Sequence, residues 1–60
     1  MNKILITKEV AKLLRVSEGF VRKLIRDKKL MAYREGNRGG YRILERDVDK
    51  YIKGKLDKSL

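Results

Sequence analysis

Basic side chains recur with helical spacing in the first half of this 60-residue chain. At about 3.6 residues per turn, Arg22, Lys23 and Arg26 share one helix face with Gly19. Glu18 lies one turn before Arg22, where an i,i+4 pair can hold the guanidinium in place. Such a face is suited to contact a negatively charged partner. A helix face that is merely solvated is the alternative interpretation.

The opposite face of this segment is apolar. Val21, Leu24 and Ile25 form one stripe, with Phe20 at its edge. We therefore expect the stripe to be buried, with Leu24 pointing between the first and third helices of the domain. The basic face is expected to remain exposed.

Two capped segments position this basic face. Residues 7–14 and 17–25 are both amphipathic, and only two residues separate them. Each opens with a hydroxyl residue, Thr7 or Ser17, whose oxygen can cap a helix N-terminus. Two helices joined this tightly must cross at a steep angle, with the small Ala11 at the crossing, which is the helix-turn-helix geometry. In that motif the second helix enters the major groove of DNA, so a DNA contact is favoured over a solvated face.

A glycine-rich loop follows the two helices. Residues 35–40 include three glycines and an asparagine, which tolerate positive φ, and short strands are expected on both sides at 31–34 and 41–43. Strand, loop and strand predict a hairpin, which after a helix-turn-helix would be a wing. The wing contacts to backbone or minor groove would come from Asn37, Arg38 and Arg42. A plain turn is the alternative, and a nucleotide-phosphate loop is disfavoured because its Lys-Ser/Thr ending is missing.

The two ends of the chain supply the rest of the core. Residues 4–6 are either a brief strand or a cover over the core, and a third helix is expected over 44–53, ending at Gly54. Core-facing positions in the first and third helices are expected at Val10, Leu13, Leu14, Leu44, Val48, Tyr51 and Ile52. The expected fold is mainly α with a small β-hairpin: a winged helix-turn-helix domain of three helices plus wing over residues 1–54. A flexible tail is expected at 55–60.

Composition narrows the function classes. Lys and Arg number 17 against 8 Asp and Glu, for a net charge of +9, and residues 22–42 hold eight basic and two acidic residues, or +6 of that total. Clustered positive charge favours a polyanionic partner. Cys and His are lacking, and no nucleophile–base pair is visible, so no enzyme activity, metal, cofactor or small-molecule ligand is expected. No apolar run approaches the roughly 18 residues of a membrane span and no signal peptide is visible, so a cytoplasmic protein without membrane contact is expected.

Short stretches along the chain also form an ordered pattern. They are LITKEVAKLL at 5–14, VS at 16–17, VRKLIR at 21–26, KL at 29–30, AYR at 32–34, Gly36, YRI at 41–43 and DV at 47–48. This pattern resembles the excisionase-family DNA-binding domains, small winged helix-turn-helix proteins related to the MerR DNA-binding domain. The resemblance covers residues 5–52 and implies a recognition helix in the major groove, with a wing on the adjacent minor groove or backbone. It also implies a protein without chemistry of its own, which binds and bends attachment-site DNA and helps a recombinase to assemble.

Four positions depart from that family pattern. Arg15 stands where a glycine is common in the turn between the helices, so this turn must accept a side chain. Phe20 stands in place of a frequent threonine and cannot offer its phosphate contact, although it can pack or touch a thymine methyl. Lys28 and Met31 replace a frequent glycine and proline, so the end of the second helix is expected to differ.

The expected DNA site has three parts. Base edges would be contacted by Arg22, Lys23, Gly19 and Glu18. Phosphates would be held by Lys8, Ser17, Arg26, Tyr33 and Tyr41, and the wing contacts by Asn37, Arg38 and Arg42. An ordinary surface lysine is an equal interpretation of Lys8, and core or hairpin positions are equal interpretations of the two tyrosines.

These features together predict a sequence-specific double-stranded DNA-binding protein, first of all an excisionase-like recombination accessory factor. The alternatives are a small MerR-like transcription regulator or the DNA-binding domain of a transposase. The partners would be double-stranded DNA and either a recombinase (integrase) or further copies of the protein on repeated sites. An alternative from a different class is a protein-interaction module that binds an acidic protein through the basic face. A shift assay with competing duplex DNA would distinguish this module from a DNA-binding protein. RNA is disfavoured because no exposed aromatic platform is visible.

Overall fold

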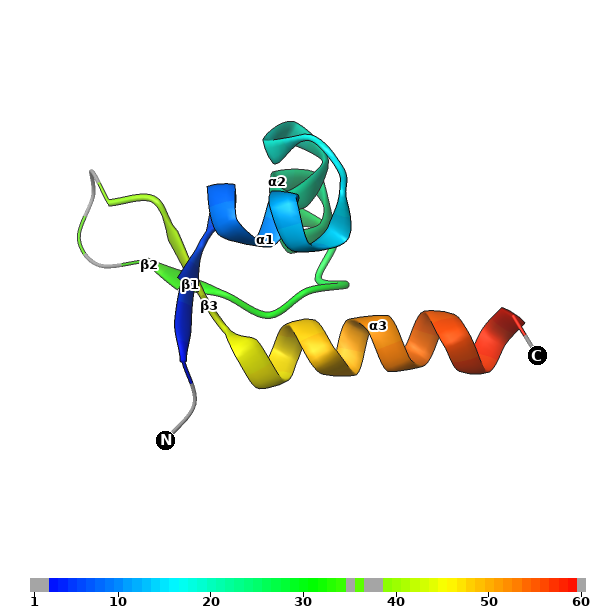
Figure 1. Ribbon diagram of the computed structural model, residues 1–60. Coiled ribbons are helices and arrows are strands. Elements are labelled where there is room, and N and C mark those ends of the chain that lie inside the picture. The colour runs from blue at the N-terminus through cyan, green and yellow to red at the C-terminus, as the bar shows by residue number, and fades with distance from the viewer. Residues whose placement is uncertain (1–2, 35, 37–38, 60) are drawn as a thin grey trace.

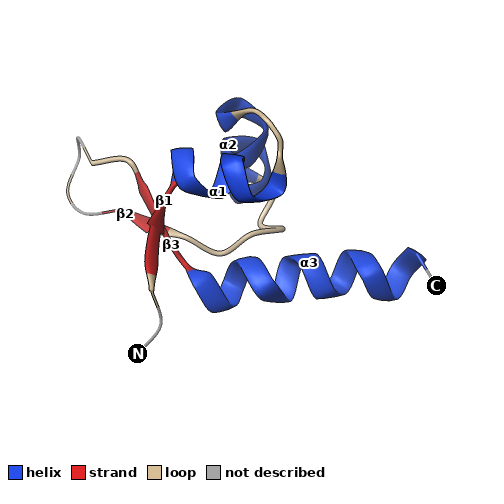
Figure 2. Ribbon diagram, viewed as in Figure 1, coloured by secondary structure: helices blue, strands red, loops and turns tan. Residues whose placement is uncertain are grey.

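Three helices and a three-stranded antiparallel sheet make up the described part of the chain (Figures 1 and 2). The computed structural model describes residues 3–34, 36 and 39–59. The elements follow in the order β1 (Ile4–Ile6), α1 (Thr7–Leu14), α2 (Glu18–Arg26), β2 (Tyr33–Arg34), β3 (Tyr41–Leu44) and α3 (Glu45–Ser59). The predicted fold class, mainly α with a hairpin after a helix-turn-helix, is confirmed.

The strand β3 lies at the centre of the sheet, between β1 and β2. Leu5 of β1 is paired with Ile43, and Arg34 of β2 is paired with Tyr41. Residues 4–6, for which the sequence allowed a strand or a plain cover, therefore form a strand. Because side chains alternate between the two faces of a strand, the buried Leu5 and Ile43 define the face of the sheet that meets the helices.

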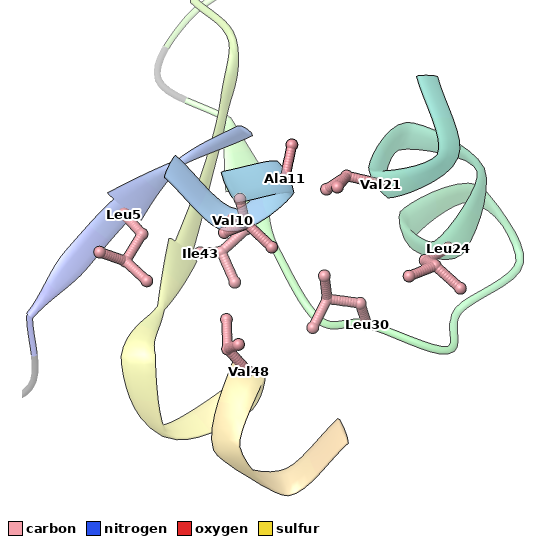
Figure 3. Close-up of a cluster of buried hydrophobic side chains, with 8 residues drawn as sticks. All are labelled: Leu5, Val10, Ala11, Val21, Leu24, Leu30, Ile43 and Val48. Carbon is pink, nitrogen blue, oxygen red and sulfur yellow. The ribbon is translucent and has the colours of Figure 1, made fainter. Parts of the chain in front are cut away.

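A cluster of buried apolar side chains joins the helices to the sheet (Figure 3). Val10 of α1, Val21 of α2 and Ile43 of β3 are fully buried. Burying a side chain of this size contributes about 1.5–3 kcal/mol, so a few such residues carry much of the stability of a small domain. Ala11 lies beside Val21 in Figure 3, between α1 and α2, which is where the sequence placed a small residue. The cluster consists of Leu5, Val10, Ala11, Val21, Leu24, Leu30, Ile43 and Val48.

The two helix N-termini are capped in different ways. Ser17 caps α2 as predicted, because its Oγ accepts a hydrogen bond of 3.1 Å from the Phe20 N–H. Thr7 is not the cap of α1, so that prediction is wrong. The chain passes from β1 into α1 without a break, and Ile6 holds the extended cap position while its N–H donates to Glu9 Oε1 at 2.9 Å. Thr7 is instead the first residue of the helix.

A basic residue with a left-handed backbone follows each helix of the helix-turn-helix. Arg15 after α1 has a φ of 59°, and Lys28 after α2 has a φ of 61°. After each of them, the next N–H donates to the carbonyl five residues back, at 3.0 Å for Val16 and 2.9 Å for Lys29. Glycine adopts this conformation without strain, whereas other residues lose about 1 kcal/mol. The turn therefore accepts the Arg15 side chain as predicted, and Lys28 takes a backbone conformation that favours glycine.

Several apolar residues differ from their predicted places. Leu13, expected to face the core, is 58% exposed, because α2 and the sheet cover only the side of α1 that carries Val10. Ile52, also expected in the core, is 37% exposed. Leu44 is not helical, because it pairs with Ile4 as the last residue of β3.

The third helix also continues beyond its predicted end. It runs through Gly54 to Ser59, so the end at Gly54 is wrong. A glycine within a helix costs only about 1 kcal/mol, which neighbouring residues with good helix propensity can offset. The flexibility of residues 55–60 stays a prediction.

Candidate nucleic-acid interface

A groove with a volume of about 550 Å³ lies where α1 and α2 begin and the hairpin approaches them. Its wall includes Lys8 of α1, Arg22 of α2, Arg34 of β2 and Arg42 of β3. Glu18 is the carboxylate among its lining residues. We name this surface the basic groove. Four elements that are separate in the chain thus line one concavity, and the cations Lys8, Arg22 and Arg34 around it attract an anion such as a nucleic-acid backbone.

The second helix separates its buried face from its basic face as predicted. Val21 is fully buried and Leu24 is 5% exposed, while Arg22, Lys23 and Arg26 are exposed. Arg22 is the member of this basic set that reaches the groove, whereas Lys23 and Arg26 lie on the exposed surface outside it. The exposed basic surface therefore extends from the groove along one side of α2.

Gly19 leaves the first turn of α2 without a side chain at this position. A Cβ added at Gly19 would lie 3.8 Å from Arg22 Nη2 and 3.8 Å from Ser17 Oγ. The Arg22 side chain therefore turns back toward the N-terminus of α2, where backbone N–H groups and the helix dipole favour anions. The Ser17 oxygen is engaged in the helix cap, and its hydroxyl proton remains available for donation to a phosphate.

Arg34 is a groove residue that the sequence did not single out. Its Nε donates a hydrogen bond of 3.2 Å to the Gly39 carbonyl, and its Cζ lies 5.5 Å from the centre of the Tyr41 ring. Arg34 thereby connects β2 to the chain just before β3, at the base of the hairpin. Its place within the +6 region was visible in the sequence, but its position opposite Tyr41 follows from the strand register.

The remaining hairpin residues divide between the two faces of the sheet. Tyr41 is half-buried and packs against the core, and it also lines the basic groove, so the structure is compatible with both of its interpretations. Tyr33 is 41% exposed and is paired with Arg42, so these two share the face that turns away from Ile43. Gly36 has a φ of 73°, the positive value for which a glycine was expected in the loop. Asn37 and Arg38 lie outside the described residues.

Two other kinds of site are missing from the described residues. Within residues 3–34, 36 and 39–59, no helix has both the length and the apolar character needed to cross a membrane. In the same ranges, no three side chains of His, Cys, Asp or Glu gather closely enough to hold a metal ion.

The fold and the basic groove together define a helix-turn-helix DNA-binding domain. A family model described as "Helix-turn-helix domain" matches residues 4–56, and the chain belongs to this family. Membership implies DNA binding, and domains of this kind are typically non-catalytic. No curated protein and no solved structure matches the chain.

Proposed function

We propose that this protein binds a specific site in double-stranded DNA, with α2 in the major groove and the wing beside it. The wing is the hairpin of β2, β3 and the loop between them. The observation that carries the proposal is the basic groove, in which Arg22 of α2 faces the same concavity as Arg34 of the wing. A helix and a wing that share one concave basic surface can contact a major groove and the adjacent backbone at the same time.

Each part of this surface has its own role in the proposal. Arg22 and Lys23 would donate to guanine O6 and N7, and Glu18 would accept from a cytosine amino group. Gly19 would let the backbone of α2 approach the bases closely, because it has no side chain there. The residues assigned to phosphates are Lys8, Ser17, Arg26, Tyr33 and Tyr41, and those assigned to the wing contact are Asn37, Arg38 and Arg42.

For the biological role we propose an excisionase-like accessory factor, which binds and bends attachment-site DNA for a recombinase. The resemblance of residues 5–52 to excisionase-family domains supports this role, and a small MerR-like transcription regulator is the second candidate. A bending assay separates specific DNA binding from DNA bending. When the protein is bound, the gel mobility of circularly permuted duplexes should depend on the position of the selected site within the duplex. Specific binding without a position-dependent shift would retain the DNA site and remove the bending role.

Salt dependence tests the DNA proposal directly. If the basic groove and the exposed face of α2 neutralise about five to seven phosphates, log K should fall against log salt with a slope of about −4 to −6. The site would first be selected from random duplexes, and its affinity would then be measured by fluorescence anisotropy at several salt concentrations. A slope near zero would reject DNA as the partner of this surface.

A further inference from the structure

A second concavity lies between the α1–α2 turn and the second half of α3. It has a volume of about 280 Å³ and is lined by the apolar side chains Leu14, Val16, Phe20, Tyr51, Ile52 and Leu56. None of these residues lines the basic groove. We name this second concavity the apolar hollow. The hollow is therefore a separate concavity from the basic groove.

One stripe of α3 passes from the core into this hollow. Val48, Ile52 and Leu56 follow each other at i, i+4 and i+8, so they lie on one side of the helix. Their exposed fractions rise along the stripe, from 1% at Val48 to 37% at Ile52 and 61% at Leu56. Figure 1 shows α3 running beneath α1 and α2 toward the C-terminus, away from the sheet. The apolar stripe thus continues for two helical turns beyond the residues that the core covers.

The α1–α2 side of the hollow is also apolar and accessible. Phe20, at the edge of the buried stripe of α2, is 43% exposed. Phe20 and Leu56 line the same hollow, so their exposed side chains contribute to one apolar concavity. A concavity of this size accommodates one large apolar side chain of a partner.

The rim of the hollow is positively charged. Lys55 is the charged residue in its wall, and its Nζ lies 5.7 Å from the centre of the Tyr51 ring. An adjoining depression that meets the hollow at Val16 is lined by Lys8, Lys12 and Arg15, and another that meets it at Tyr51 is lined by Lys29. The first depression also holds Glu18, and it shares Lys8 and Glu18 with the basic groove. An apolar centre with Lys55 in its wall and further cations beside it is complementary to an apolar side chain flanked by carboxylates.

Arg15 adds a second indication at this rim. Its φ of 59° is a value that strains residues other than glycine, yet it carries a long basic side chain that is exposed. Lys28 has the same backbone conformation, so what distinguishes Arg15 is its place in the depression beside the apolar hollow. A cation at this place can attract an acidic partner.

We propose that the apolar hollow is the docking site for an acidic amphipathic helix of a partner protein. The helix inserts one large apolar side chain between Phe20 and Leu56 and places carboxylates toward Lys55 and its cationic neighbours, the helix-in-groove mode of recognition. A second copy of this chain is disfavoured as the occupant because each copy carries a charge of +9. A lipid surface is disfavoured because the apolar side chains line a concavity, whereas membrane insertion uses apolar groups that protrude.

The experiment uses the full chain and a defined peptide probe. The probe is a capped synthetic helix of about 15 residues, with Glu on its polar face and Leu, Phe or Trp as the central residue of its apolar face. Fluorescence anisotropy gives its affinity, and amide chemical shifts locate its contacts. The expected result is binding with shifts around the apolar hollow, both for the free protein and for its complex with duplex DNA. A matched peptide with Lys in place of Glu should not bind.

Two pairs of variants make the result specific. Leu56→Ser should weaken peptide binding about tenfold, the effect of losing one well-packed interface side chain, while Leu13→Ser should leave it unchanged. Leu13 is a fair control because it is 58% exposed and lies outside the hollow. Lys55→Glu should weaken binding and Lys53→Glu should not, which tests the rim independently of the apolar wall. Affinity for DNA is measured for every variant and should be unchanged by Leu56→Ser. A failure of the DNA-binding proposal can then be distinguished from a failure of the docking proposal.

Several results would overturn the proposal. Absence of binding for all three peptides would rule out the docking site. Equal losses of peptide affinity for Leu56→Ser and Leu13→Ser would show that the binding is non-specific hydrophobic association. Binding to phosphatidylglycerol vesicles that depends on Leu56, without peptide binding, would assign the hollow to a lipid surface. A dimer in sedimentation equilibrium that Leu56→Ser dissociates would assign it to a second copy of the chain.

Discussion

The helix-turn-helix and the wing are held in place by different forces. Helices α1 and α2 supply half of the buried cluster, and each ends in a hydrogen-bonded left-handed turn. The strand β2 has only two residues, both exposed, and it depends on the register with β3 and on the contacts of Arg34. Burial in the core therefore holds α2 in place, whereas a few polar contacts at the surface hold the wing. Mutations in the two regions should therefore have separable effects on stability and on DNA binding.

The largest expected effect is loss of the helix-turn-helix core. Leu24→Ala should reduce the free energy of unfolding by about 2–5 kcal/mol, because it leaves a cavity between α2 and the rest of the core. In a small domain this approaches the whole stability. The measurement is urea unfolding followed by circular dichroism. Leu13→Ala provides the matched control and should stay within about 0.5 kcal/mol of the wild type, because Leu13 is mostly exposed. Equal losses in both variants would mean that burial does not distinguish the two faces.

The next effect concerns binding by the preformed helix. Arg22→Ala should cost about 1–3 kcal/mol on the selected site and little on random DNA, because it removes contacts to base edges. Lys8→Ala should weaken both about equally, as the loss of a phosphate contact does. Anisotropy titrations on the two DNAs give both differences. Equal losses of affinity for Arg22→Ala on specific and random DNA would mean that Arg22 contacts the phosphate backbone and not the base edges.

A smaller effect is expected from the wing. Arg34→Ala removes the hydrogen bond to the Gly39 carbonyl and the contact with the Tyr41 ring, and it should weaken DNA binding by about 1 kcal/mol while changing the melting temperature little. The amide signals of Gly36 and Gly39 should shift in the free protein. Arg34→Lys keeps the charge but loses the guanidinium geometry. Full recovery of binding by lysine would show that only the charge of this residue matters.

The smallest expected effect is a gain in stability at the turn. Arg15→Gly should raise the free energy of unfolding by about 0.5–1 kcal/mol, because glycine adopts the left-handed conformation without strain. Arg15→Ala keeps the strain and removes the charge, so it should not stabilise the domain. Thermal unfolding of the three proteins at equal concentration makes the comparison. A destabilised glycine variant would mean that the Arg15 side chain contributes more to folding than its backbone conformation costs.

Local features of the fold were predictable because their causes lie within a few residues of the chain. The amphipathic period of α2, the Ser17 cap and the need of the turn to accept a side chain at Arg15 all depend on neighbours within one or two helical turns. The Thr7 cap was not predictable in the same way, because it depended on how β1 enters α1. The end of α3 was missed because one glycine weakens a helix without stopping it.

The helix-turn-helix, the charge of its exposed face and the family pattern follow from the sequence, since periodicity and composition act along the chain. Which residues from distant segments meet depends on the three-dimensional packing. It paired Arg34 with Tyr41, brought Lys8 and Arg42 to the groove of Arg22, and left Leu13 and Leu56 exposed. The physical reason is that strand register and helix packing are set by burial of the whole core. That burial joins residues far apart in the chain, and no local pattern encodes their pairing.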